Sequence, residues 1–554
     1  MKLKIGLLLD SEYDSKYIYE FVSWAKKQDD IDVSHLIIQN LTKENEKDNF
    51  LSKIRKFIKY RGVNTFISYL FFQLLVFFEF QVLKNNINHS NHFAKFDLQE
   101  LIMNKILLTP IVSKSGFVYH FNEDDINKVR KEKFDLLIRF GSGILHGKIL
   151  ESSRFGVLSF HHADNTINRG GPPGFWEVFL RQSTTGYTLQ ILTDELDGGN
   201  VISKGRIPTR GYFLLNQATL YEISNIYLMQ LIKKIAIERK LPKIEIKQPY
   251  YYPLYKLPST GIIFKYIYKT LSFYVARFLY KSFGYDYVWN IGFAAKSWNE
   301  VSFWKSRKIS RPSGHFLADP FLVFDNQKIF CFAEDYVYKE KRGQIAVYDL
   351  TNKKPQRLGV ALNETFHLSF PYIFNYENNY YMCPETSEKN EIRLYRCIEF
   401  PLKWELFKII KSNVSAVDTL IFKKDNLWWM FTNIDTNKSK DHHSELHIFY
   451  SASPLSCSWA SHPMNPVYVD ATCARNGGII EEDGKYFRVS QQHGFGHYGR
   501  NIVLNEIINL TTDYFEEKPI CSIYPNFYPK ISGIHHFHSK NGLTVFDYAS
   551  WQRI

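Results

Sequence analysis

The second half of the chain repeats one pattern about every 50 residues: two short aromatic runs joined by polar turn residues. The clearest repeats are DPFLVFDNQKIFCFAED, FPYIFNYENNYYMCPET, DTLIFKKDNLWWMFTN and RNGGIIEEDGKYFRVSQ, which begin at Asp319, Phe370, Asp418 and Arg475. A fifth and weaker repeat covers residues 533–548. Aromatic runs bounded by turn residues predict strands, and a fixed period of this size is typical of radial repeats. We therefore predict an all-β five-bladed propeller over residues 296–554.

Residues 1–245 follow a different pattern, in which strand-like and helix-like segments alternate. Lys4–Leu9 and the apolar runs Asp135–Arg139 and Gly156–Phe160 predict buried strands. Asn122, followed by three acidic residues, predicts the capped start of a helix. The alternation predicts a mainly parallel sheet with covering helices, that is, a Rossmann-like α/β domain.

Residues 246–295 form a basic, aromatic linker between these two domains. Lys265, Lys269, Arg277 and Lys281 recur at multiples of four, which predicts a helix with a basic face. Two interpretations stay open: a helix that rests on a membrane surface, or a linker helix whose lysines point to water.

The charge and cysteine content narrow the class of protein. A net charge of +13 favours acidic partners such as nucleotide phosphates, anionic polysaccharide, nucleic acid or an anionic membrane. The six cysteines form no Cys-x-x-Cys pair, and no Gly-x-Gly-x-x-Gly occurs in the N-terminal domain. We therefore expect no metal site, no dinucleotide site and a reducing compartment. The apolar run Thr65–Phe78 is shorter than the roughly 18 residues of a spanning helix, so we expect a cytoplasmic protein that can rest on a membrane.

Polar residues gather where the strand at 156–160 ends, in LSFHHADNTINRGGPPGFWEV. Ser159 and His161 are two apart, so they share one face of the strand. Ligands of open α/β sheets bind at this carboxyl edge. Asp197 precedes two glycines after a later strand, as a carboxylate on a tight turn does. A His–Asp pair suits general acid–base chemistry.

The same segment resembles the formyltetrahydrofolate-dependent formyltransferases, a family that includes methionyl-tRNA formyltransferase and the sugar N-formyltransferases. Ser159-Phe160-His161 stands where that family has Asn-x-His. The further matches are Arg169-Gly170 for Arg-Gly, Gly186-Tyr187-Thr188 for Gly-x-Thr, and Asp197-Gly198-Gly199 for Asp-x-Gly.

This resemblance implies transfer of a formyl group from N10-formyltetrahydrofolate to an amine. It implies that His161 and Asp197 are catalytic, and that Ser159 occupies the place of the asparagine that donates to the developing oxyanion. Asn165 is an alternative donor from the following loop. His162 and Asp164 are either substrate contacts or local loop contacts. The candidate substrate- or cofactor-binding residues are His162, Asp164, Asn165, Arg169, Gly170 and Gly186.

The propeller repeats resemble two families. His315-x-x-Ala318-Asp319-Pro320 is similar to the first blade of arabinanase- and xylosidase-type glycoside hydrolases. HLSFPYIFNYENNYYMCPETSE and SAVDTLIFKKDNLWWMFTN resemble more closely the N-terminal propeller of plant glucosamine inositolphosphorylceramide transferases.

The hydrolase resemblance implies a base at Asp319 and a pKa-tuning carboxylate at Asp418. Arg475 stands where the acid is expected, and Glu385 is a nearby carboxylate at a strand end. Three roles stay open for the propeller: binding of a glycan or sugar nucleotide, hydrolysis, or a structural role.

Together these patterns predict a formyltransferase-like enzyme that acts on an amino sugar, nucleotide-linked, in surface polysaccharide biosynthesis. The propeller is expected to hold a glycan, and peripheral membrane contact is a further expectation. The alternatives are a methionyl-tRNA formyltransferase, or a glycan-binding protein with an inactive transferase site. We expect no nucleic-acid partner, and the oligomeric state stays open.

Overall fold

The computed structural model describes residues 2–40, 58–59, 61–86, 89–113, 116–195, 198–352, 354–436 and 441–554. The chain divides into two compact units, Met1–Ser272 and Phe273–Ile554. The division falls inside helix α7 (Thr260–Ser282). Each unit is described below by itself.

A seven-stranded sheet forms the centre of the N-terminal unit, in the order β12-β11-β10-β8-β1-β3-β5. The strands from β5 to β10 pair in parallel, and β11 and β12 are antiparallel. The predicted mainly parallel sheet is thus present, because apolar runs at β1, β8 and β10 are buried on both faces. The strands are β1 (Leu3–Leu9), β3 (Ile31–Gln39), β5 (Lys105–Leu108), β8 (Leu136–Arg139), β10 (Val157–His161), β11 (Thr184–Ile191) and β12 (Asn200–Pro208).

The helices of this unit cover the sheet. The longest, α6 (Phe213–Glu238), packs against α1 (Lys16–Ala25), α5 (Phe175–Leu180) and β11. Helix α4 (Glu123–Lys131) begins at its predicted cap, where the Asn122 side chain accepts a hydrogen bond from the Asp125 N–H at 2.8 Å. The short elements are β2 (Tyr13–Ser15), which pairs β4 (Lys95–Asp97), and β6 (Ile111–Val112), β7 (Val118–His120), β9 (Ile144–Leu145) and the 3₁₀ turn Lys148–Glu151.

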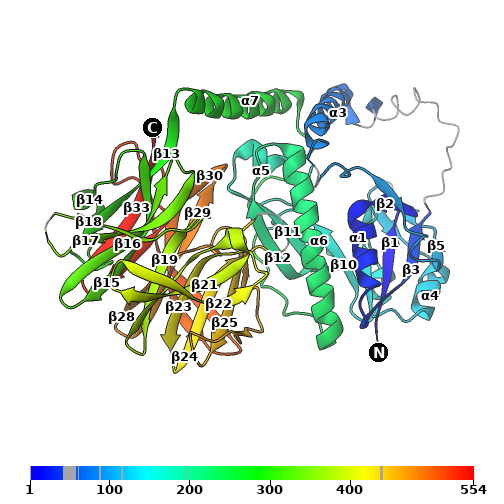
Figure 1. Cartoon of the computed structure of the whole chain (residues 1–554). Coiled ribbons are helices and arrows are strands. Elements are labelled where there is room, and N and C mark those ends of the chain that lie inside the picture. The colour runs from blue at the N-terminus through cyan, green and yellow to red at the C-terminus, as the bar shows by residue number, and fades with distance from the viewer. Residues whose placement is uncertain are drawn as a thin grey trace. The chain divides into compact units, whose positions relative to one another are not determined.

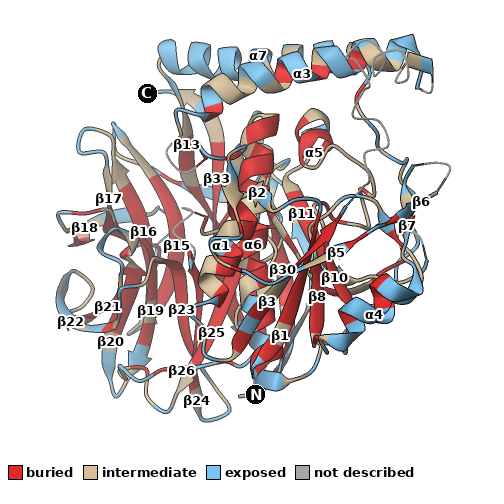
Figure 2. Cartoon of the chain, turned by 90° about the vertical axis from the view of Figure 1, so that its right-hand side faces the viewer, coloured by how far each residue is buried: buried red, intermediate tan, exposed pale blue. Residues whose placement is uncertain are grey.

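Helix α3 (Val63–Leu83) corrects one expectation. It runs for 21 residues, past the Phe78 at which the uncharged run ends, and is long and apolar enough to cross a membrane by length and composition. Only 22% of its most apolar window is buried. Figure 2 shows α3 and α7 largely tan and pale blue, whereas α6 is mostly red.

The C-terminal unit is built from five antiparallel sheets in its described residues (Figure 1). Four of them follow the chain: β15–β18 (His315–Asp325, Lys328–Val337, Arg342–Asp349, Gln356–Leu362), β19–β22 (Ser369–Tyr376, Asn379–Glu385, Glu391–Glu399, Lys403–Ser412), β23–β26 (Ala416–Lys424, Leu427–Ile434, Glu445–Ser451, Ala460–Ser461) and β28–β31 (Asn476–Glu482, Lys485–Gly494, His497–Leu510, Phe515–Ile523). The short strand β27 (Tyr468–Val469) pairs with β25.

The fifth sheet joins the two ends of the unit. Its order is β14-β13-β33-β32, with β13 (Tyr285–Ala294), β14 (Arg307–Ile309), β32 (Phe537–Lys540) and β33 (Leu543–Arg553). One edge strand of each sheet contacts an edge strand of the next in turn, from β15 through β19, β23 and β28 to β32 and back to β15. This closed ring is the arrangement of a five-bladed β-propeller, and the predicted all-β second half is confirmed.

Candidate functional site

A pocket of about 310 Å³, here called the β10 pocket, opens at the carboxyl ends of β8 and β10. Arg139 ends β8, and Ser159 and His161 close β10, so the strand ends deliver all three to the same edge. Its other lining residues are Val118, Gly143, Ile144, Leu145, His146, Phe160, Gln190, Leu192, Thr193, Asp194, Glu195 and Gly199.

His161 is fixed in one orientation by its own loop. Its Nε2 donates to the Asn168 carbonyl oxygen at 2.7 Å. Because a carbonyl can only accept, Nε2 carries the proton in the neutral ring, and the lone pair lies on Nδ1.

Arg139 stands beside Ser159, with Nη1 3.4 Å from the Ser159 hydroxyl oxygen. Ser159 is buried. Burial lowers the pKa of the Arg139 guanidinium from its ordinary value, yet a guanidinium stays protonated in proteins. The pocket therefore contains a fixed positive charge next to the Ser159 hydroxyl.

Asp164 and His162 have partners within the N-terminal unit. The Asp164 carboxylate accepts from Arg206 at 2.7 Å and from the Thr166 hydroxyl at 2.6 Å. These donors, against the opposing effect of burial, lower the pKa of Asp164. The His162 ring stacks on Phe160, with centroids 4.7 Å apart, and burial lowers its pKa to about 3. The His162 ring also lies 4.2 Å, between centroids, from the Tyr221 ring of α6, so both residues have partners beyond their own loop.

Gly186 and Gly170 are sites of close backbone approach. A Cβ on Gly186 would lie 2.6 Å from the Asp164 backbone nitrogen, and one on Gly170 would lie 1.8 Å from the Tyr255 carbonyl oxygen. Both glycines let a loop pack against the sheet or the linker.

Arg169 and Asn165 line a second pocket, of about 240 Å³. The Arg169 guanidinium lies over the Tyr250 ring, 4.6 Å from its centroid, and donates to the Asn165 carbonyl oxygen at 2.9 Å. Asn165 and Arg169 thus line a different pocket from Ser159 and His161. Asp197 lies outside the described residues.

Two residues behind His161 were missed by sequence reasoning. Asn168 is buried and donates from its side chain to Glu177 Oε1 at 3.0 Å. Burial raises the pKa of Glu177. Glu177 is the single charged residue in the apolar run GFWEVFL. A lone charge in such a run indicates a buried side chain with a polar partner, and this pattern could have pointed to Glu177.

In the C-terminal unit, the first strand of four sheets carries the same irregularity. The register shifts after Ala318, Ser369, Val417 and Asn476, and at each shift two residues of the first strand lie opposite one residue of its partner, as in a β-bulge. Asp319, Phe370 and Asp418 are the first of the two bulge residues, with φ of 49°, 47° and 50°. A left-handed φ outside glycine is uncommon and concentrates at functional sites.

This equivalence corrects one repeat boundary. The fourth equivalent position is Gly477, two residues after the Arg475 at which the sequence repeat begins. Arg475 instead reaches back to the preceding sheet, and its Nε donates to Asp418 Oδ2 at 2.7 Å.

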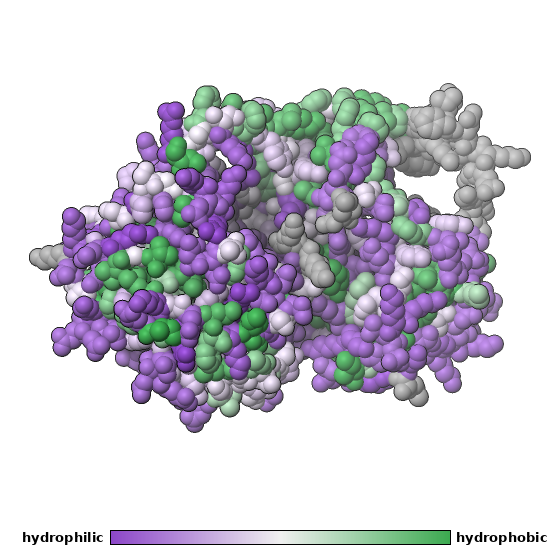
Figure 3. Space-filling view, in the orientation of Figure 1, coloured by the Kyte–Doolittle hydropathy of each residue, from purple (hydrophilic) through white to green (hydrophobic). Residues whose placement is uncertain are grey.

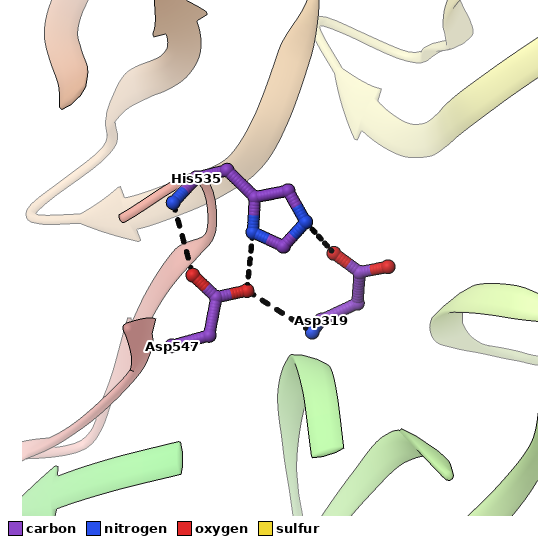
Figure 4. A group of neighbouring side chains, drawn as sticks. All are labelled: Asp319, His535 and Asp547. Atoms are coloured by element: carbon purple, nitrogen blue, oxygen red, sulfur yellow. Dashed lines mark hydrogen bonds and ion pairs between the residues drawn. The ribbon is translucent and has the colours of Figure 1, made fainter. Parts of the chain in front are cut away.

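Asp319, His535 and Asp547 form a buried group (Figure 4). Asp547 Oδ2 lies 2.5 Å from His535 Nδ1 and accepts from the Asp319 N–H at 3.3 Å. Asp319 Oδ1 lies 3.6 Å from His535 Nε2. Burial and the neighbouring carboxylates raise the pKa of Asp319 to about 7, although His535 opposes the shift. Burial alone would lower the pKa of His535, but Asp547 and Asp319 raise it.

The three side chains offer one ligand atom each within 4.8 Å of one another, which is a spacing that a cation accepts. Each of these atoms already has a partner within the group. The geometry therefore fits an internal ion-pair network as well as a cation site.

Further charged residues surround this group, and all of them together are here called the propeller centre. Burial raises the pKa of Asp418 although Arg475 lowers it, and burial raises the pKa of Glu334 well above its usual range. The Glu385 carboxylate accepts from Ser387 at 2.8 Å. Trp289 stacks on His535 with centroids 3.9 Å apart, and Tyr498 lies under Arg475 at 5.2 Å. Sequence reasoning missed His535, Asp547 and Trp289, which lie in the weak fifth repeat or before the first.

Comparison with known proteins identifies part of the C-terminal unit. Residues 299–526 match the family model of glucosamine inositolphosphorylceramide transferase 1, N-terminal. The match confirms the resemblance found in the propeller repeats. Glucosamine inositolphosphorylceramide transferase 1 of Oryza sativa subsp. japonica is 37% identical over 211 residues, which are 37% of this chain and 28% of the plant protein. The chain thus matches less than a third of that transferase.

Two further likenesses are more limited. Methionyl-tRNA formyltransferase of Bacillus velezensis is 31% identical over 83 residues, 15% of this chain and 26% of that enzyme. A GH43 protein of Bacillus licheniformis superposes with a TM-score of 0.30 at 15% identity, covering 41% of this chain and 47% of that one. At this score the structural likeness supports no inference about activity.

Proposed function

We propose that the N-terminal unit transfers a formyl group from N10-formyltetrahydrofolate to an amine of a sugar-containing acceptor. The observation that carries the proposal is the β10 pocket, which brings Ser159, His161 and the Arg139 guanidinium to one edge of the sheet. The short likeness to a methionyl-tRNA formyltransferase supports the reaction class, and the plant relative, a glucosamine transferase by name, supports a sugar.

The pocket suits a flat heteroaromatic group. Val118, Ile144, Leu145 and Leu192 supply apolar wall, and Gln190, Thr193 and Asp194 supply polar atoms. A volume of about 310 Å³ is at the lower end of small-molecule sites, so the pocket would hold the ring and leave the rest of the folate outside. The bound folate would supply the activated formyl group.

His161 would take the proton that the attacking amine loses. Its Nε2 proton is committed to the Asn168 carbonyl, so the proton is accepted at Nδ1. Glu177 holds Asn168 from behind and so positions this carbonyl.

Arg139 would replace the missing asparagine amide. The Ser159 hydroxyl is shorter than that amide, but the guanidinium beside it can donate to the oxygen on which negative charge develops. A preorganised donor of this kind contributes several kcal/mol to transition-state stabilisation, typically about 3–4.

The test is tetrahydrofolate release from N10-formyltetrahydrofolate with a panel of amino sugars, amino sugar nucleotides and initiator methionyl-tRNA. We expect release with an amino sugar and about 10²–10⁴-fold less with His161→Ala. Arg139→Met should lower kcat more than KM, and Asp124→Asn, an exposed carboxylate on α4 outside the pocket, serves as the control. If none of the amines leads to tetrahydrofolate release, and calorimetry shows no folate binding, the protein is a binding protein without transferase activity.

We propose second that the propeller centre binds a glycan. The buried carboxylates Asp319 and Asp418 and the half-buried Glu385 can accept hydrogen bonds from hydroxyl or ammonium groups, and the half-exposed Tyr498 offers an aromatic face for a sugar ring. Hydrolysis is the weaker alternative, because the Asp418 carboxylate is already paired with the Arg475 guanidinium.

Calorimetry with neutral, amino and acidic oligosaccharides tests this second proposal. Tyr498→Ala should weaken binding about tenfold or more, whereas Trp304→Ala, a 67% exposed tryptophan of the same unit, should leave it unchanged. Equal binding by both variants would place the glycan elsewhere.

A further inference from the structure

Helix α3 carries two apolar stripes, and only one of them is covered. Ser68, Phe72, Leu75 and Leu83 are buried in the N-terminal unit. The second stripe follows the helical repeat i, i+4, i+7, i+11, i+14 and is exposed. Its members with their exposed fractions are Val63 (54%), Ile67 (39%), Leu70 (46%), Leu74 (52%), Phe77 (57%), Phe78 (64%) and Val82 (60%).

The first half of α7 extends this apolar surface. Thr260 donates from its backbone to the Ser68 hydroxyl at 3.1 Å, and the Phe71 and Phe264 rings lie 5.4 Å apart. Phe264, Tyr268 and Leu271 share one face of α7 and are 54%, 74% and 60% exposed. Figure 3 shows hydrophobic side chains gathered over α3 and α7. We call the exposed stripe of α3 and these three residues the α3/α7 face.

Basic residues border the α3/α7 face within the N-terminal unit. Lys59, Arg61 and Lys84 flank α3, and the exposed Lys265 follows Phe264 on α7. The single acidic residue in either helix is Glu79. Its carboxylate is turned inward, where it accepts from the Leu214 N–H at 2.8 Å and from the Tyr266 hydroxyl. An apolar face with a purely basic border complements an anionic lipid surface.

The topology excludes a spanning role for α3. Strand β3 precedes α3 and β5 follows it, and the two strands pair in the same sheet. Likewise β2 before the helix pairs with β4 after it. A helix that crossed a bilayer once would leave these partners on opposite sides of it, so a single crossing by α3 does not fit these strand pairs.

We propose that the α3/α7 face inserts into the outer part of an anionic lipid bilayer and holds the N-terminal unit at the membrane. The exposed aromatic and aliphatic side chains enter the boundary between head groups and acyl chains, while the flanking lysines and arginines contact the anionic head groups. The partner is the lipid surface itself, and no second protein is needed.

Co-sedimentation of the full chain with vesicles tests the proposal. We expect binding to vesicles of phosphatidylcholine with 30% phosphatidylglycerol, and weak binding to pure phosphatidylcholine. The variant Leu74→Gln/Phe77→Gln/Phe78→Gln should lower the partition coefficient at least about tenfold, because three exposed apolar side chains no longer enter the lipid. Lys265→Gln should lower it about fivefold, and only on the anionic vesicles.

The matched control is Trp304→Gln/Ile398→Gln/Tyr524→Gln, which removes equally exposed apolar groups from the C-terminal unit. The control should bind as the wild type does, and circular dichroism melts should show all variants folded. The proposal is overturned if the wild type stays in the supernatant, or if the α3 variant and the control bind alike. It is also overturned if light scattering shows a dimer that the α3 variant dissociates and no vesicle binding.

Discussion

In the β10 pocket, His161 is held by a carbonyl seven residues away, whereas in the propeller centre Asp547 accepts from a backbone N–H 228 residues away. The first contact belongs to one loop. The second contact joins β33 to β15, the first strand of the next sheet. Asp319 on β15 in turn accepts from the Phe370 N–H on β19 at 3.2 Å, so the same kind of contact joins that sheet to the one after it.

The two regions therefore differ in how far their candidate functional side chains also hold the fold together. A side chain held within its own loop can change without loosening the sheet behind it. A buried carboxylate that joins two sheets supports the ring, so any ligand site at the propeller centre shares its residues with the fold. Changes in the two regions should therefore have effects of different kinds.

The largest stability effect should come from Asp547→Ala. It removes the acceptor of the His535, His536 and Asp319 N–H groups and leaves His535 without its closest counter-charge. We expect a loss of about 3–5 kcal/mol in the free energy of unfolding. Urea denaturation followed by tryptophan fluorescence measures it, with the exposed Asp513→Ala as control. An unchanged midpoint would show that the centre does not hold the ring together.

Arg475→Met should follow, at about 2–3 kcal/mol, because it leaves Asp418 buried without its guanidinium partner. The second variant Asp418→Asn, added to the first, should restore most of this loss, since no unpaired charge then remains. If the double variant is no more stable than Arg475→Met alone, the pair does not act as a unit. The same denaturation experiment, on the wild type, both single variants and the double variant, gives the four free energies of unfolding that this comparison needs.

In the N-terminal unit the sharpest stability effect should be Gly186→Ala, at about 1–3 kcal/mol. The added Cβ meets the Asp164 backbone and pushes the loop away from β11. Gly261→Ala in α7 is the control, because its Cβ meets nothing within 4 Å and alanine favours a helix. Thermal unfolding by circular dichroism compares the two. Equal stability of both variants would mean that the loop moves without cost.

The smallest effect concerns pH. The folded state raises the pKa of Asp319 to about 7, while the unfolded chain releases that proton near 4. The raised pKa of His535 adds stability that is complete below about 6.5 and is lost as pH rises further. Both groups therefore make the propeller less stable at pH 8 than at pH 5, by on the order of 1 kcal/mol.

The N-terminal unit contains groups of both signs. The pKa of Asp164 is lowered, so its contribution is lost only under acid conditions. Burial raises the pKa of Glu177 and raises that of Glu79 to about 7, so these two carboxyls also favour pH 5 over pH 8. Urea midpoints at both pH values test this, and Asp319→Asn should flatten the dependence of the propeller transition. A propeller that is more stable at pH 8 would contradict the assignment.

Local patterns predicted the elements better than the contacts between them. The strands at β8 and β10, the Asn122 cap and the strand pairs of the propeller follow from periodicity and turn residues close in sequence. The length of α3 did not, because Glu79 ends the uncharged run and its partners Tyr266 and Leu214 lie 187 and 135 residues away. Asp547 beside Asp319 was missed for the same reason, whereas Asn168, only seven residues from His161, was missed because periodicity does not describe the loop that turns its carbonyl toward the ring. A pattern along the chain does not encode which distant backbone group a buried side chain will meet.

The pairing of β13 with β33 fixes an order of events during synthesis. All seven strands of the N-terminal sheet lie before residue 209, so that sheet can form while later residues are still being made. The propeller is different, because β13 (Tyr285–Ala294) pairs over its whole length with β33 (Leu543–Arg553), which is synthesised much later. Until β33 has been made, β13 has an unpaired edge, and that edge must be kept from pairing with a strand of another chain.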